Sequence, residues 1–115
     1  MDFEQAMMKH AEWKSKLRTA LYGKEQLDPA AVSKDNLCEF GKWLYGEAMH
    51  LHASKPAFRK CVEEHAAFHR EAGRVAVAIQ EKRIEEAEKM LAPGSDYSEV
   101  SKRVGIAIQE LKKQA

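Results

Sequence analysis

Hydrophobic positions recur at helical spacing over much of this chain. In residues 2–22, apolar side chains return every three or four positions, and lysine, arginine and glutamate fill most positions between them. This pattern is typical of an amphipathic helix with one buried face, and Gly23 is expected to end it. The same spacing begins again after Ser54, which can cap a helix, and Pro56, which fits a first turn. From there it predicts the longest helix of the chain.

Two breaks are predicted in the second half of the chain. The helix that starts near Pro56 is expected to be interrupted near residues 81–83 and to end at Pro93-Gly94, because proline cannot continue a helix. Ser95 or Asp96 then caps a last helix. The inner face of this last helix is predicted to consist of Tyr97, Val100, Val104, Ala107, Ile108 and Leu111.

The segment between the first two long helices is predicted to be less regular. Residues 24–36 have the composition of a loop that holds one short turn. Residues 37–45 suit a short helix, opened by Asp35 or Asn36 as N-cap and closed near Gly46. Each of these helices has an apolar face that needs a partner, which predicts an all-α fold, an antiparallel four-helix bundle with an additional short helix.

Composition narrows the class of protein. The 115 residues are about one domain's worth, and 44% hydrophobic residues are enough for a core, so we expect residues 1–115 to form a single domain. Nineteen Lys and Arg against 18 Asp and Glu predict neither a nucleic acid nor a membrane surface as partner. There is no apolar run of the roughly 20 residues that cross a bilayer. With only two cysteines, a reducing, cytoplasmic location is expected.

Three histidines and a cysteine fall on predicted interior positions. His65 and His69 are four residues apart, so they share one helical face. Such a pair can also be two histidines that share a helical face by chance. Two buried imidazoles without polar partners would, however, be costly, and a bound cation would supply the partner. His10 lies on the apolar stripe of the first helix, and Cys38 lies in the first turn of the short helix. Nitrogen and sulfur donors favour tetrahedral zinc over calcium or magnesium.

Three sequence blocks carry a family resemblance. His10-Ala11-Glu12-Trp13, Cys38-Glu39-Phe40-Gly41-Lys42-Trp43 and His65-Ala66-Ala67-Phe68-His69 are similar, in order and spacing, to the chemoreceptor zinc-binding domain family. The resemblance covers essentially the whole chain, with no departure at a ligand position. It implies Zn²⁺ in the core of a helical bundle and a domain that usually forms a homodimer. The ligands that it implies are His10, Cys38, His65 and His69.

The other notable residues are expected to have supporting roles. Gly41, inside the short helix, costs about 1 kcal/mol relative to alanine, so we expect a close backbone contact there. Cys61 is expected to be a small core residue, with a resolving role toward Cys38 as the alternative. His50 and His52 are expected in a surface loop. A packed shell that limits water access to the metal is expected from Trp13, Phe40, Gly41, Trp43 and Phe68.

No enzyme is predicted. The HExxH arrangement of hydrolytic zinc enzymes is absent, four protein ligands would close the zinc shell, and the inner stripes offer no carboxylates for a di-iron site.

The resemblance implies instead a sensory domain, of the kind that accompanies bacterial chemoreceptor signalling domains and diguanylate cyclases. A zinc-bound thiolate is the form that oxidants such as hypochlorous acid attack. We therefore expect a sensor of zinc or oxidants in which Cys38 is the redox switch. Its partners would be a second copy and an adjacent signalling domain of a larger parent protein. The alternative is a static, zinc-stabilised dimerisation module.

Overall fold

Helices account for nearly all of the ordered secondary structure. The computed structural model describes residues 1–23 and 26–115, and no β-strand occurs among them. The long helices are α1 (Phe3–Leu21), α5 (Pro56–Gln80) and α7 (Asp96–Gln114). The shorter elements are α2 (Pro29–Val32), α3 (Glu39–Trp43), the π-helical turn η1 (Leu44–Ala48), α4 (Met49–His52) and α6 (Ile84–Met90).

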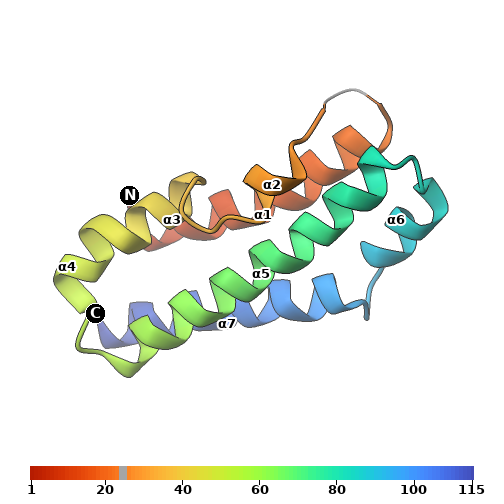
Figure 1. Cartoon of the computed structure of the whole chain (residues 1–115). Helices are drawn as coiled ribbons and strands as arrows, with labels where there is room; N and C mark the ends of the chain where they lie inside the picture. Colours follow the sequence, from red (N-terminus) through yellow and green to blue (C-terminus); the bar gives the residue numbers. More distant parts are fainter. Residues whose placement is uncertain (24–25) are drawn as a thin grey trace.

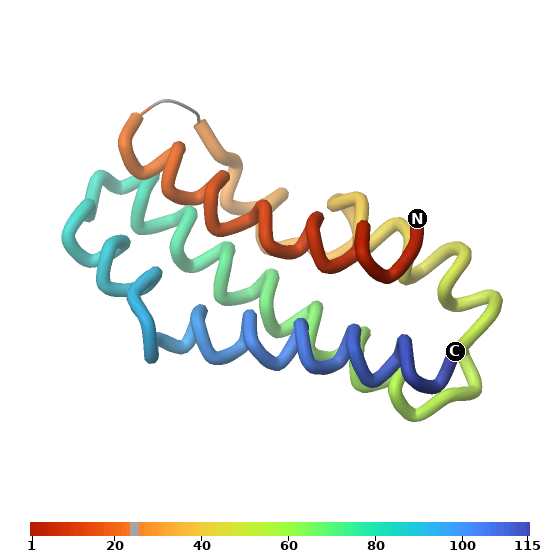
Figure 2. Tube along the Cα trace, turned by 180° about the vertical axis from the view of Figure 1, so that it is seen from behind, coloured from red at the N-terminus to blue at the C-terminus, as the bar shows by residue number. Residues whose placement is uncertain are grey.

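The elements α3, η1 and α4 follow one another without a gap and together make the fourth helix of a bundle. Figure 1 shows α1 and α5 running in one direction and the α3–α4 segment and α7 running in the other. Seen from behind, α1, α5 and α7 lie side by side along the long axis (Figure 2), and the molecule measures 43 × 25 × 19 Å. The predicted antiparallel four-helix bundle is confirmed, with α2 and α6 as short additions.

Local capping explains where α1 begins and ends. The Asp2 carboxylate accepts a hydrogen bond from the Gln5 amide at 2.8 Å, and the Gln5 side chain accepts one from the Asp2 amide at 2.9 Å. This reciprocal pair satisfies two amides that the first turn would leave without partners. At the other end, Gly23 has φ +80°, a backbone conformation that glycine adopts without steric cost. The predicted helix and its predicted stop are therefore confirmed.

The second half of the chain follows the prediction closely. Lys82 has φ +62° and separates α5 from α6 within the expected residues 81–83. Ser95 caps α7 by accepting a hydrogen bond from the Ser98 amide at 3.1 Å, and all six predicted inner residues of α7 are buried. One detail was wrong. The N-cap of α5 is Lys55 rather than Ser54, because Lys55 is the last residue with extended backbone angles.

The short helix differs from its prediction at its start. Its N-cap is Cys38 rather than Asp35 or Asn36, because Cys38 still has extended backbone angles and its own sulfur accepts a hydrogen bond from the Gly41 amide at 3.2 Å. Cys38 thus precedes the first turn, and the helix begins at Glu39.

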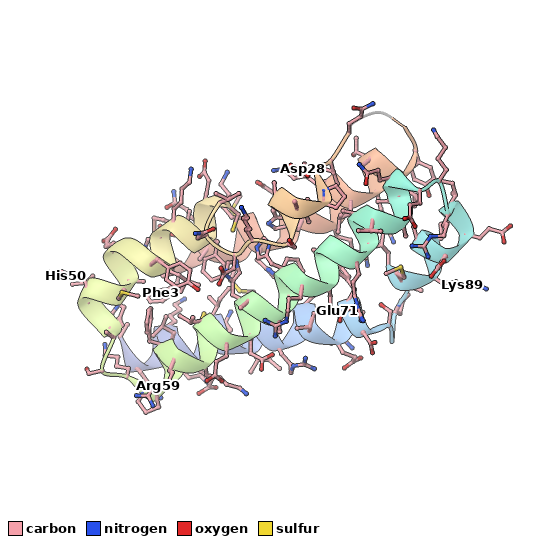
Figure 3. The ribbon with its side chains drawn as sticks, viewed as in Figure 1. Phe3, Asp28, His50, Arg59, Glu71 and Lys89 are labelled. Atoms are coloured by element: carbon pink, nitrogen blue, oxygen red, sulfur yellow. The ribbon has the colours of Figure 1, made fainter. Side chains whose placement is uncertain are left out.

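The same helix also continues further than predicted. Gly46 does not close it, because the chain there widens into the π turn of η1 and continues as α4. His50 and His52 consequently lie on a helix, and their assignment to a loop was wrong. His50 is exposed on the outside of the bundle, whereas His52 is half-buried, with its ring 6.1 Å from that of Phe3 (Figure 3).

Candidate metal centre

Helix α5 brings two imidazoles together in the core. His65 and His69 are one turn apart on its buried face, with 1% and 0% of their surface exposed and their ring centroids 4.5 Å apart. Burial lowers the pKa of His65 to about 3, and it also lowers the pKa of His69. Both rings are therefore neutral at pH 7, the state in which imidazole binds a metal.

Cys38 reaches the histidine pair from the start of α3. Its Sγ lies 3.5 Å from Nε2 of His65 and 3.4 Å from Nε2 of His69. The three donor atoms lie within 4.8 Å of one another. Zinc binds sulfur at about 2.3 Å and nitrogen at about 2.0–2.1 Å, so a sulfur and a nitrogen in one tetrahedral shell are about 3.5 Å apart. The two observed separations between sulfur and nitrogen match this value.

A backbone carbonyl fixes the orientation of His69. Its Nδ1 donates a hydrogen bond to the carbonyl oxygen of Val32, at the end of α2, at 2.7 Å. A carbonyl only accepts, so Nδ1 carries the proton and Nε2 presents its lone pair toward Cys38. Helix α2 can approach α5 this closely because Gly73 has no side chain, and a Cβ there would lie 2.8 Å from Cβ of Ser33. The sequence carried no signal for this partner, because a backbone carbonyl has no side-chain signature.

Gly41 allows the Cys38 loop to pack directly on α3. A Cβ at Gly41 would lie 1.8 Å from the carbonyl oxygen of Asp35 and 2.9 Å from its carbonyl carbon. The expected close backbone contact at Gly41 is thus confirmed. A second contact also holds the loop against this helical segment: the Tyr45 hydroxyl donates a hydrogen bond to the Asp35 carboxylate. Cys38 is therefore positioned by a backbone contact and a side-chain hydrogen bond on its own segment.

His10 lies in the core but is not part of the three-residue cluster. It is 6% exposed, and its ring packs edge-on against Phe68, with centroids 4.6 Å apart. Its Nε2 lies 3.2 Å from the carbonyl oxygen and 3.0 Å from Oγ of Ser101 on α7. Donation to the carbonyl leaves Nδ1 as the nitrogen with a free lone pair. Burial lowers the pKa of His10 to about 4.

Two buried nitrogen atoms near the cluster lack a hydrogen-bond partner among the described residues. They are Nδ1 of His10 and Nδ1 of His65. Buried polar atoms are nearly always paired, and an unpaired one costs about 1–3 kcal/mol. The structure thus brings Cys38, His65 and His69 together and leaves His10 with an unused lone pair in the same part of the core. This donor set is suited to zinc.

Aromatic rings surround the cluster. Trp13 packs edge-on against His69 at 5.2 Å between centroids, and Phe40 packs against His65 at 4.7 Å. Phe68 lies 5.3 Å from His69 between ring centroids and is fully buried. Trp43 stacks on Phe40, with 5.8 Å between the ring centroids. The cluster is therefore walled by apolar surface, which lowers the local dielectric and limits the access of water.

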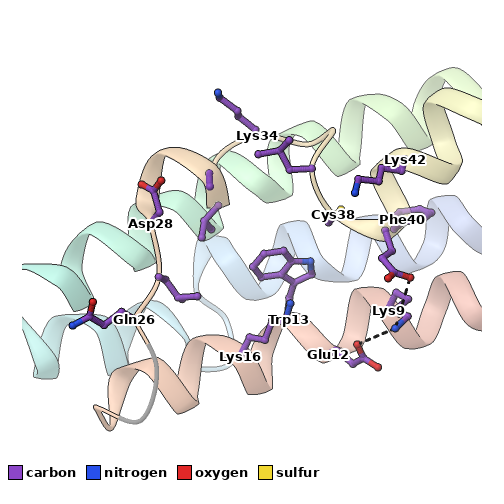
Figure 4. A pocket seen from close by; sticks show the side chains of 15 residues that line it. Lys9, Glu12, Trp13, Lys16, Gln26, Asp28, Lys34, Cys38, Phe40 and Lys42 are labelled. Atoms are coloured by element: carbon purple, nitrogen blue, oxygen red, sulfur yellow. Dashed lines mark ion pairs between the residues drawn. The ribbon is translucent and has the colours of Figure 1, made fainter.

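Cys38 is the member of the cluster that faces outward. It is half-buried and lines a surface pocket of about 460 Å³ between α1 and residues 26–42, whereas the two histidines of the cluster do not line it (Figure 4). Burial raises the pKa of the Cys38 thiol, and a bound zinc ion would reverse this, because it deprotonates a coordinating thiol. Cys61 is separate and fully buried on α5, where burial raises its pKa to about 12.

Comparison with known proteins gave one match. The family model described as the chemoreceptor zinc-binding domain matches residues 10–76, more than half of the chain. The matched region contains all three members of the cluster and His10, and it ends before α6 and α7. No curated protein and no solved structure matches the chain.

Proposed function

The chain belongs to the chemoreceptor zinc-binding domain family, whose members are zinc-binding regulatory domains, and from this we propose that it senses zinc or oxidants through a zinc-bound Cys38. Zinc is its cofactor. The observation that carries the sensory proposal is the double role of Cys38, whose sulfur belongs to the metal cluster and also caps α3. A change at this one atom therefore acts on the metal and on the backbone together.

The proposed ligands are His10, Cys38, His65 and His69. Support for His10 as the fourth ligand comes from its buried, unpartnered Nδ1 and from the carbonyl of Ser101, which selects the ring form with the lone pair on Nδ1. To complete the shell, the His10 side chain would have to bring Nδ1 to the three-residue cluster. With four protein ligands no position would be left for a reactive water, and we propose that the domain has no catalytic activity.

A zinc ion held by this cluster would keep Cys38 in the thiolate form. When this thiolate meets hypochlorous acid, its sulfur takes up the oxygen atom and chloride leaves, which gives sulfenic acid. The oxidised sulfur is a weaker metal ligand and a poorer acceptor for the Gly41 amide. Since α3 is only five residues long and its loop is tied down mainly by the contact of Asp35 with Gly41 and Tyr45, this segment would lose order first.

We propose that the domain acts as a homodimer and regulates an adjacent signalling domain of a larger protein in the cytoplasm. Large apolar side chains remain exposed on the described surface, including Met8 at 63%, Leu51 at 58% and Ile106 at 62%, and a second copy could cover some of them. No helix among the described residues is long and apolar enough to cross a membrane. Sedimentation that shows a monomer at tens of micromolar protein would contradict the dimer.

Metal analysis tests the ligand set. We expect one zinc per chain after purification without chelator, and weaker binding with a largely helical chain after replacing His10, Cys38, His65 or His69 by alanine. His50→Ala and His52→Ala are matched controls, because these residues lie on α4 away from the cluster and should leave zinc binding unchanged. Full zinc binding by the double variant of His65 and His69 would refute the site.

Hydrogen exchange tests the switch. After mild hypochlorous acid treatment, we expect loss of amide protection concentrated at residues 36–45, and Cys38→Ser should abolish the response. A uniform loss of protection, or a response that persists in the Cys38 variant, would place the switch elsewhere. No change in exchange or in dimer geometry would favour the second candidate, a static zinc-stabilised dimerisation module.

A further inference from the structure

One short segment of the chain contacts both nitrogen atoms of the His69 ring. The carbonyl oxygen of Val32 accepts the hydrogen bond from Nδ1 at 2.7 Å, and the Cys38 sulfur lies 3.4 Å from Nε2. Both contacts come from residues 28–38, which begin with the N-cap of α2 and end at the metal cluster. Helix α2 is therefore connected to the metal centre in two ways, through the imidazole ring and through the chain.

Helix α2 has little stability of its own. It is four residues long, and an isolated helix of this length does not persist in water. Its first turn is capped locally, because the Asp28 carboxylate accepts a hydrogen bond from the Ala30 amide at 3.1 Å. Beyond this cap, the helix is held by packing on α5, where Val32 is 5% exposed (Figure 1). The formation of α2 therefore depends on its contact with α5.

This contact is made at Gly73, one turn after His69 on the buried face of α5. A Cβ at Gly73 would lie 2.8 Å from Cβ and 3.2 Å from Cα of Ser33, the residue that follows Val32. Neither atom can rotate away, because one is backbone and the other is attached directly to it. Non-bonded carbons settle at about 3.5 Å, so α2 would have to move by about 0.7 Å. Such a movement would stretch the bond from His69 to Val32 beyond the usual limit of about 3.2 Å.

We propose that Gly73 is a positioning residue of the metal centre, which acts by allowing α2 to dock on α5 so that Val32 holds His69. Histidines that bind zinc almost always donate their second N–H to a fixed acceptor, and losing that partner costs about 10- to 100-fold in metal affinity. Coupling between two equilibria is reciprocal, so bound zinc must favour the docking of α2 by the same factor. The docking of α2 thus reports whether the metal centre is occupied. This inference rests on zinc binding at the cluster and is independent of a redox role for Cys38.

Zinc affinity tests the role of Gly73. In competition with a chromogenic chelator, Gly73→Ala should bind zinc at least about tenfold more weakly than the parent protein. Ser33→Gly removes the nearer of the two clashing atoms, so the double variant should bind almost as tightly as Ser33→Gly alone. Gly105→Ala is the matched control, because its Cβ would meet only Cε of Met7, at 3.7 Å. Equal affinities of Gly73→Ala and Gly105→Ala, or a loss that Ser33→Gly does not rescue, would overturn the proposal.

The imidazole proton separates positioning from a general loss of stability. In zinc-loaded protein with ¹⁵N-labelled histidine, the proton on Nδ1 of His69 should exchange slowly with water, because Val32 accepts it. Exchange should become fast in Gly73→Ala and slow again in the double variant with Ser33→Gly. A variant that was only less stable would keep this proton protected while it bound zinc, and that result would contradict the proposed role.

Hydrogen exchange on the unmodified chain keeps the proposal testable if Gly73→Ala does not fold. The amides of Val32, Ser33 and Lys34 donate hydrogen bonds at the end of α2, and zinc should slow their exchange by about tenfold. Helix α6 is the internal control, since it is also short and carries no member of the cluster. Its Ala87 amide and the following Leu91 amide should slow clearly less.

The outcomes for the two short helices distinguish this inference from the proposed function. Equal slowing in α2 and α6, or no slowing in either, would mean that zinc does not act on α2 specifically and would overturn the coupling. Zinc binding that is indifferent to α2 refutes this inference and leaves the metal site in place. A chain that binds no zinc refutes the metal site, and with it both the coupling and the proposed function.

Discussion

Replacing Gly41 by alanine should disable the metal centre without touching a ligand. A Cβ at this position would lie 1.8 Å from the carbonyl oxygen of Asp35, whereas non-bonded atoms settle at about 3.5 Å. The loop and α3 would therefore have to separate by about 1.7 Å. Both neighbours are backbone, so no side chain can rotate away to make room. The Cys38 sulfur accepts a hydrogen bond from the Gly41 amide, and Cys38 follows the same loop. The sulfur would therefore move with the loop and α3.

The expected size of the effect follows from two opposing contributions. Alanine is favoured over glycine inside a helix by about 1 kcal/mol, but overpacking of a close contact costs about 1–3 kcal/mol or more. We expect the metal-free protein to lose about 1–2 kcal/mol of its free energy of unfolding. Zinc ligands tolerate about 0.2 Å of displacement, so the zinc affinity should fall by about 10- to 100-fold, which corresponds to about 1.4–2.8 kcal/mol.

Gly46→Ala is the matched control. Gly46 lies in the same helical segment five residues further on, and a Cβ there would meet nothing within 4 Å. It should be neutral or stabilising by up to about 1 kcal/mol, with unchanged zinc affinity. Affinity is measured by competition with a chromogenic chelator, and stability by urea unfolding with and without zinc. If Gly41→Ala bound zinc as tightly as Gly46→Ala, the argument that backbone contact positions Cys38 would be refuted.

Three further changes probe other parts of the bundle. Burial raises the pKa of Cys61 from 9.0 to about 12, so the folded chain keeps a proton that the unfolded chain loses above pH 9. Its contribution to stability should be complete below pH 9 and decline by about 1.4 kcal/mol per pH unit from there to about pH 12. In urea unfolding, the slope of stability against pH should be smaller by this amount in Cys61→Ala. Arg103→Ala removes a 2.7 Å hydrogen bond to the buried carboxylate of Glu64 and should cost about 1–2 kcal/mol in the same assay, whereas no loss would show that solvent replaces the arginine. Ser101→Ala removes a hydroxyl 3.0 Å from His10 Nε2 but leaves the Ser101 carbonyl in place. Chelator competition should therefore show at most about a tenfold loss of zinc affinity. A loss as large as that of His10→Ala would contradict the carbonyl as the main hydrogen-bond partner of His10.

The parts of the fold that depend on local sequence could be predicted. The cap at Ser95 and the six buried positions of α7 follow from side-chain chemistry and from the period of an α-helix. The break near Lys82 and the stop at Gly23 follow from where the apolar pattern lapses and from the conformational freedom of glycine. His65 and His69 were identifiable because polar rings on an apolar face require a partner, and the structure supplies Cys38 as their neighbour.

Features that depend on contacts between distant residues could not be predicted. Helix α2 has only four residues and is stabilised by packing on α5 at Gly73, so its own sequence reads as a loop. Val32 and Ser101 orient histidines through backbone carbonyls, and such acceptors are present at every position of a chain. Cys38 was missed as an N-cap because sulfur is an uncommon capping atom, and the metal cluster fixes its position.

The π turn at Leu44–Ala48 also bears on how this segment can change length. A π turn accommodates one residue more than an α-helical turn, and such turns are frequent at functional sites. Deleting one residue between 44 and 48 would restore a regular α-helix, and everything downstream would keep its facing about the helix axis, because the wide turn already absorbs the extra residue. Upstream, α3 and the sulfur at its start would keep their place. The wide turn thus allows this segment to gain or lose one residue while the metal ligand before it and the exposed Met49 and Leu51 after it both keep their facing.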